Sequence, residues 1–189
     1  TRDVRLLLDT LKNIDKVDAV VMDLRANGGG SLIEAIDLTG LFIDKGPVVQ
    51  VKDLRGNVEV DEDKQPGAIW EGPLGVIVDR LSASASEIFA GAIQDYGRGV
   101  VMGTQTYGKG TIQSSIDLNR FVNPSMLQKM AALFKKTETV SIPDKQTKGE
   151  PASSIVLDKD GIPQLGQINL TIGKFYRVNG NSTQHKGVM

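Results

Sequence analysis

The stretch that decides the fold is residues 19–30, Ala-Val-Val-Met-Asp-Leu-Arg-Ala-Asn-Gly-Gly-Gly. Its first six residues are a short apolar run rich in β-branched side chains, which predicts a buried strand. The glycines predict a tight turn, and beyond them apolar and small residues recur at helical spacing, at Leu32, Ala35, Ile36, Thr39, Gly40 and Ile43. Strand, glycine turn and helix in this order form half of a βαβ unit, so we expect an α/β fold.

A second strand, turn and helix follow further along the chain. Leu74–Val78 predicts a buried strand, residues 80–83 a sharp turn, and Ser84–Tyr96 a helix. We also expect a helix over 2–13, a hairpin of Val48–Lys52 with Val58–Val60, strands at Val100–Met102, Thr111–Leu118 and Asn169–Val178, and a helix around 126–134. Residues 121–168 are expected to form a divergent excursion, with 143–163 exposed.

Composition excludes several classes of function. The 189 residues are 40% hydrophobic and carry a net charge of −1, which gives no electrostatic basis for binding nucleic acid. No apolar run approaches the roughly 20 residues that would cross a bilayer. There is no cysteine, which rules out disulfides and thiolate chemistry. The only histidine, His185, lies in a polar stretch and is expected at the surface, so a two-histidine zinc site is excluded.

Ser84 is the strongest candidate for chemistry, within Leu81-Ser82-Ala83-Ser84-Ala85-Ser86-Glu87. A serine on a tight turn from strand to helix presents its hydroxyl at the edge of the sheet. The following N–H groups and the helix dipole then face any negative charge that develops. The same motif also predicts a capping box, in which the Glu87 side chain returns to the serine N–H. The two interpretations are compatible.

A nucleophilic serine needs a base, and Lys109 is the candidate, in Tyr107-Gly108-Lys109-Gly110-Thr111. The flanking glycines let the backbone pass closely and direct the lysine inward. A lysine base must be neutral, and burial in an apolar pocket favours the neutral amine. Gln113 could orient that amine without charging it. The alternative for Lys109 is an exposed hairpin lysine.

Two glycine-rich segments remain to be interpreted. Gly103-x-x-x-x-Gly108-Lys109 begins like a phosphate-binding loop, but Gly110 replaces the required Ser or Thr and a strand pattern follows, so we reject that function. Asn27-Gly28-Gly29-Gly30 follows a buried strand, where N–H groups can form an anion-binding concavity. Such a turn supplies half of an oxyanion hole in an acyl-transfer enzyme, although any turn between strand and helix can contain glycines.

Together these motifs resemble the C-terminal processing, or tail-specific, peptidases, with the bacterial periplasmic tail-specific proteases as the branch that they resemble most. The resemblance rests on residues 24–30, 82–87 and 108–113, and continues through 174–180 and 182–188. It implies a crotonase-like (Clp protease-like) α/β core of stacked ββα units with a mixed sheet. It also implies a Ser-Lys dyad, with the site residues Ser84 as nucleophile, Lys109 as base, Gln113 to position the lysine, Gly30 and Ala85 as backbone oxyanion donors, and Glu87 and Asp95 as supporting acids.

What the resemblance implies for function is peptide-bond hydrolysis through an acyl-enzyme, without metal or cofactor. Substrates would be polypeptides with apolar C-termini, and the location would be the periplasm of the bacterial envelope. We expect residues 1–189 to be a partial catalytic core whose full-length parent adds a PDZ domain and helical flanking regions. The alternatives are a crotonase-type acyl-CoA hydratase or isomerase, which has no use for a serine paired with a lysine, and a non-catalytic peptide-binding relative.

Overall fold

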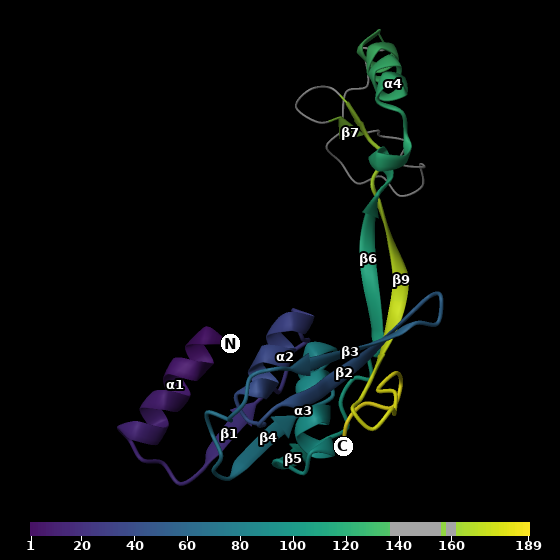
Figure 1. Cartoon of the computed structure of the whole chain (residues 1–189). Coiled ribbons are helices and arrows are strands. Elements are labelled where there is room, and N and C mark those ends of the chain that lie inside the picture. The colour runs from purple at the N-terminus through teal and green to yellow at the C-terminus, as the bar shows by residue number, and fades with distance from the viewer. Residues whose placement is uncertain (137–155, 158–161) are drawn as a thin grey trace. The chain divides into compact units, whose positions relative to one another are not determined.

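The computed structural model describes residues 1–136, 156–157 and 162–189 (Figure 1). The chain divides into two compact units, one of Thr1–Ile112 with Thr171–Met189 and the other of Gln113–Leu170. Residues 121–168, for which the sequence predicts a divergent excursion, fall within the range of the second unit. Helices and strands are interspersed along the first unit, with a parallel sheet among them, which confirms the α/β class. Across the described residues, no helix is both long enough and apolar enough to span a membrane.

A three-stranded parallel sheet forms the centre of the first unit. Its strands are β1 (Val20–Asp23), β4 (Leu74–Val78) and β5 (Val100–Gly103), in the order β1-β4-β5. Both pairings are parallel, as expected when helical connections separate the strands. The carboxyl ends of β1 and β4 therefore meet at the same edge of the sheet. The turns that carry the predicted site residues begin at that edge.

A second sheet has the order β3-β2-β9-β6. It contains β2 (Gly46–Asp53), β3 (Val58–Asp63), β6 (Thr111–Asp117) and β9 (Gln167–Tyr176). Strand β2 is antiparallel to both β3 and β9. Parallel and antiparallel pairing are thus both present, but on two separate sheets instead of one mixed sheet. In the hairpin of β2 and β3, Asp53 Oδ1 accepts from the N–H groups of Arg55 and Asn57, at 2.8 Å each. The turn is therefore stabilised by hydrogen bonds between its own residues.

The helices of the first unit are α1 (Arg2–Asn13), α2 (Leu32–Gly40) and α3 (Ala85–Asp95). The predicted boundaries of α1 are correct, whereas α2 ends three residues before the expected Ile43. The N–H groups of Leu41 and Phe42 donate to carbonyls three residues back, at 3.2 and 2.9 Å, and this tightened turn ends the helix.

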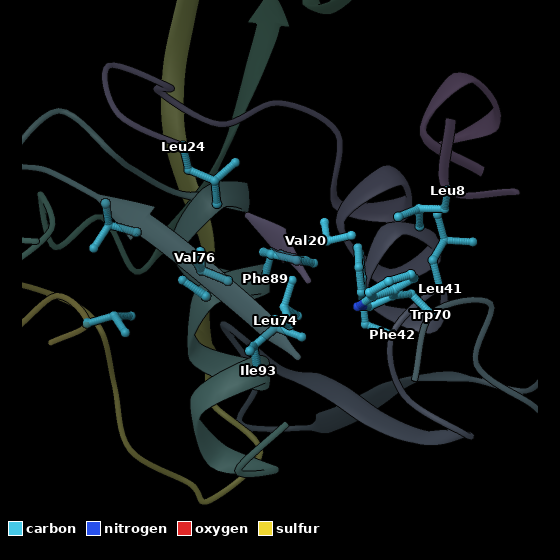
Figure 2. Close-up of a cluster of buried hydrophobic side chains, with 13 residues drawn as sticks. Leu8, Val20, Leu24, Leu41, Phe42, Trp70, Leu74, Val76, Phe89 and Ile93 are labelled. Atoms are coloured by element: carbon cyan, nitrogen blue, oxygen red, sulfur yellow. The ribbon is translucent and has the colours of Figure 1, made fainter. Parts of the chain in front are cut away.

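Helix α3 lies in the middle of the hydrophobic core. On one side, Phe89 and Ile93 join a cluster with Leu74 and Val76 of the parallel sheet (Figure 2). On the other, Ile88 and Ala92 join a second cluster with residues of α2, β2 and β9. All eight residues from Ser86 to Ile93 are buried. A helix packed on both sides holds its N-terminus, and hence Ser84, in a fixed position.

The second unit contains η1 (Leu118–Phe121), α4 (Pro124–Lys136) and two short strands, β7 (Val156–Leu157) and β8 (Pro163–Gln164), which pair antiparallel. Helix α4 confirms the helix expected around residues 126–134. The short strands and η1 were not expected. Most of the predicted exposed excursion at 143–163 lies outside the described residues.

Candidate active site

Ser84 ends the turn between β4 and α3 and is the N-cap residue of α3. Its backbone has φ 57° and ψ −114°, a conformation that is rare for any residue except glycine. Such backbone strain persists only where the surrounding structure enforces it, and it concentrates at functional sites. The Ser84 N–H donates to Glu87 Oε2 at 2.8 Å, so the carboxylate contact of the predicted capping box is present.

The carboxylate of Glu87 is completely buried. Its Oε1 accepts from the Thr106 hydroxyl at 2.6 Å and from the Gly108 N–H at 2.7 Å. Its Oε2 accepts from the N–H groups of Ser84 and Lys109, at 2.8 and 2.9 Å. Four hydrogen bonds compensate the burial of this side chain. Through them, Glu87 joins the Ser84 turn to the Gly-Lys-Gly turn, which is separate from it in the sequence.

Lys109 follows β5 in the loop that leads to β6, and its side chain is half-buried. The structure brings its backbone to the Ser84 turn, although no hydrogen bond among the described residues joins the Lys109 amine to the Ser84 hydroxyl. Gln113, the residue expected to orient the amine, lies on β6 with an exposed side chain and belongs to the second unit.

The glycine turn at residues 27–30 packs directly against the Ser84 turn. The Asn27 carbonyl accepts from the Ala83 N–H and from the Ser86 hydroxyl, both at 3.0 Å. Gly29 has φ +96°, and a Cβ there would lie 2.5 Å from the Ala83 carbonyl oxygen and 2.7 Å from the Ala85 nitrogen. Only glycine fits this contact. The predicted oxyanion donors Gly30 and Ala85 therefore belong to two turns that touch.

Asp79 is a residue that the sequence analysis missed. Its Oδ1 accepts from the N–H groups of Ala26, Leu81 and Ser82 at 3.0, 2.9 and 3.1 Å. These bonds, above all the one from Ala26, hold the pKa of Asp79 below its usual range. The signal was an aspartate immediately after a buried strand, where it can accept from the turn that follows. Asp79 thus ties the end of β4 to the chain just beyond β1, beside the glycine turn at residues 27–30.

A cavity of about 230 Å³ opens beside Gly30 and Ala85, the two predicted oxyanion donors. Gly30 and Ala85 both line it, with Asn27, Gly29 and Ser86 nearby. The rest of its wall combines the apolar side chains of Val4, Leu24, Ala35, Leu38 and Phe89 with the polar residues Thr1, Ser31 and Glu34. An apolar side chain can therefore be accommodated next to the N-terminus of α3.

Asp95 does not belong to this group. It lies at the C-terminal end of α3, and at about 1.5 Å per residue the helix places it roughly 16 Å from Ser84. It forms an ion pair with Arg177, with side chains that are 5% and 14% exposed. Asn179 also donates to Asp95 Oδ1, at 2.7 Å. These contacts join the end of α3 to the chain just beyond β9.

His185 has an exposed side chain, as predicted. Its backbone, however, lies at the site, because its N–H donates to the Gly108 carbonyl at 2.8 Å. The residues that follow β9 therefore reach the lysine turn, which the sequence analysis did not anticipate.

Comparison with known proteins identifies relatives of this chain. The tail-specific protease of Haemophilus influenzae is 44% identical over 188 residues, which cover 100% of this chain and 22% of that protein. The chloroplastic carboxyl-terminal-processing peptidase 2 of Arabidopsis thaliana is 44% identical over 117 residues, covering 61% of this chain and 22% of that protein. The chain thus spans about a fifth of the length of these relatives.

A solved structure, a photosystem II D1 C-terminal processing protease, superposes with a TM-score of 0.68 at 25% identity. The match covers 98% of this chain and 36% of that one. The family model described as peptidase family S41 matches residues 1–189. On these grounds the chain belongs to peptidase family S41.

Proposed function

We propose that this chain carries the catalytic site of a serine endopeptidase of the C-terminal processing type, with Ser84 as nucleophile and Lys109 as general base. The observation that carries the proposal is the shared contact on Glu87. One buried carboxylate oxygen accepts from the backbone of both residues, at 2.8 and 2.9 Å. Two segments that are distant in sequence are thereby held side by side, as a nucleophile and its base require.

The chemistry follows from this arrangement. The neutral Lys109 amine removes the proton from the Ser84 hydroxyl as its oxygen attacks the carbonyl carbon of the scissile peptide bond. The backbone N–H groups of Gly30 and Ala85 stabilise the oxyanion of the tetrahedral intermediate. The Lys109 ammonium then protonates the leaving amine, which leaves an ester on Ser84. Water, activated by the same lysine, hydrolyses that ester and frees the hydroxyl. Gln113 is proposed to orient the amine, as the family resemblance implies.

The substrate class follows from the cavity and the relatives. The apolar part of the wall beside Gly30 and Ala85 favours an apolar side chain next to the bond that is cut. The named relatives are a tail-specific protease and a C-terminal processing peptidase, so we propose polypeptides with apolar C-termini as substrates. We also propose that a PDZ domain elsewhere in the gene product binds the C-terminus of the substrate.

The proposed location of the protein is the periplasm. Separation of periplasm from cytoplasm, with detection by antibody, tests that location.

The deciding experiment substitutes the base in the complete gene product. Arginine keeps the positive charge but does not deprotonate in this pH range, so Lys109→Arg is expected to abolish turnover. Ser84→Ala should do the same, and Lys45→Arg, an exposed lysine before β2, serves as the matched control. Turnover is followed on an unfolded protein with an apolar C-terminus. Substantial activity of Lys109→Arg would refute the general-base role.

A fluorophosphonate probe distinguishes this proposal from an acyl-CoA hydratase of similar fold. The probe should label Ser84, located by mass spectrometry, and labelling should fail in Ser84→Ala. A hydratase would not require a reactive serine at this position.

A further inference from the structure

The segment Ser182–Val188, which we call the C-terminal segment, lies against the loop that carries Lys109. At one end, the Val188 N–H donates to the Thr106 hydroxyl at 2.7 Å, and the Thr106 N–H donates back to the Val188 carbonyl at 3.2 Å. Both residues are completely buried. The Thr106 hydroxyl itself donates to Glu87. The C-terminal segment is therefore connected to the carboxylate that holds the proposed active site.

Glycines make this close contact feasible. A Cβ on Gly108 would lie 3.0 Å from the backbone of His185, and one on Gly110 would lie 2.7 Å from the Gln184 nitrogen. On the opposite segment, a Cβ on Gly187 would lie 2.7 Å from the Thr106 hydroxyl oxygen. The two glycines of the Gly-Lys-Gly sequence therefore do more than give the turn conformational freedom. They let the C-terminal segment pack directly on the lysine turn.

The three consecutive N–H groups of the turn each have a side-chain acceptor. Those of Gly108 and Lys109 donate to Glu87, at 2.7 and 2.9 Å. That of Gly110 donates to Gln184 Oε1 at 2.6 Å. Glu87 thus holds the first two N–H groups of the turn, and Gln184 holds the third.

We infer that Gln184 is a positioning residue that fixes the Lys109 backbone through the Gly110 N–H. The inference rests on the proposed role of Lys109 as the base. Gln184 need not touch the substrate, because it acts on the turn that aims the lysine. A misplacement of about 1 Å in a catalytic group can cost on the order of 100-fold in rate. Loss of the Gln184 acceptor should therefore lower kcat and leave KM nearly unchanged.

The test replaces Gln184 by methionine, which has a similar length but no amide oxygen. In the complete gene product, Gln184→Met is expected to lower kcat by about 10- to 100-fold at unchanged KM. The matched control is Gln50→Met. The Gln50 amide donates to the carbonyls of Arg177 and Val178, at 3.1 and 3.2 Å, and so holds the chain just before the C-terminal segment without contacting the lysine turn. This control should keep the kcat of the unsubstituted protein.

Turnover is expressed per folded molecule, with the folded fraction measured by circular dichroism at the assay temperature. A loss in Gln184→Met that the folded fraction fully explains, or an equal loss in Gln50→Met, would overturn the inference. So would an unchanged kcat. The proposed function is tested separately, with Ser84→Ala and Lys109→Arg. If these two variants keep their turnover, the proposed Ser-Lys dyad is refuted, and this conclusion does not depend on the result for Gln184→Met.

Discussion

Ser84 and Lys109 donate their backbone N–H groups to the same oxygen, Glu87 Oε2, at 2.8 and 2.9 Å. The oxygen belongs to a carboxylate with no solvent exposure, so water cannot replace either donor. The separation of the two backbones is therefore set by the size of one atom and two hydrogen bonds. This makes Glu87 more than a helix cap. It is the residue through which the position of α3 determines the position of the lysine turn.

Replacing Glu87 by glutamine tests that relationship. The amide nitrogen cannot accept, so two of the four donors around the side chain would face another donor. Each buried group left unpaired costs about 1–3 kcal/mol, and we expect a clear fall in the free energy of unfolding together with a loss of turnover. Urea denaturation and kcat measure the two effects.

The control for this variant is Glu59→Gln. Glu59 is exposed on β3, and its substitution should change the free energy of unfolding by less than about 0.5 kcal/mol. If Glu87→Gln matched that control in both stability and turnover, the shared carboxylate would have no organising role.

Asp95 is expected to act through stability. Removing one partner of a buried ion pair typically costs about 3–5 kcal/mol, because the other charge is left unpaired. Asp95→Ala should therefore destabilise the protein strongly, and the shape of its pH–rate profile should remain the same because Asp95 lies far from Ser84. Asp3→Ala is the control, since Asp3 forms an exposed pair with Arg2. A changed profile in folded Asp95→Ala would indicate a direct part in proton transfer.

The sequence predicted the elements of the first unit well because their signals are local. The apolar run before Asn27, the glycines after it and the serine before α3 each determine structure within a few residues. The contacts that assemble the site are different in kind. Glu87 contacts Thr106, and Gln184 contacts Gly110, only after the chain has folded. These partners are distant in sequence, so local sequence patterns cannot predict the contacts.

Other differences also have physical reasons. Asp79 was missed because a single aspartate after a strand is common, and its bond to Ala26 depends on how β1 pairs with β4. The early end of α2 reflects a tightened turn that periodicity does not reveal. The division at Gln113 was not foreseen, since β6 continues as one strand across it.

From the cavity beside Gly30 and Ala85 we predict which side chain is preferred before the scissile bond. Ala35 lines this cavity from α2, and phenylalanine there would fill part of its volume of about 230 Å³. Ala35→Phe should lower kcat/KM for peptides with leucine before the scissile bond more than for those with alanine or glycine. Each methylene that no longer fits is worth about 10- to 200-fold. Ile33→Phe, on the exposed side of α2, is the control. Equal losses for all three peptides would show that the cavity does not receive this side chain.

Asp79 gives the protein a predictable sensitivity to acid. The N–H groups of Ala26, Leu81 and Ser82 hold its pKa below the usual range in the folded state. The folded protein therefore binds fewer protons here than the unfolded chain. The resulting stability is fully present above the unfolded pKa of about 3.9 and is lost as the pH falls through the lower folded pKa.

Melting temperatures measured between about pH 5 and pH 2 should fall less steeply for Asp79→Asn than for the unsubstituted protein. Asp37→Asn, an exposed position on α2, should follow the unsubstituted curve. Parallel curves for Asp79→Asn and the unsubstituted protein would show that this carboxyl contributes nothing to acid sensitivity.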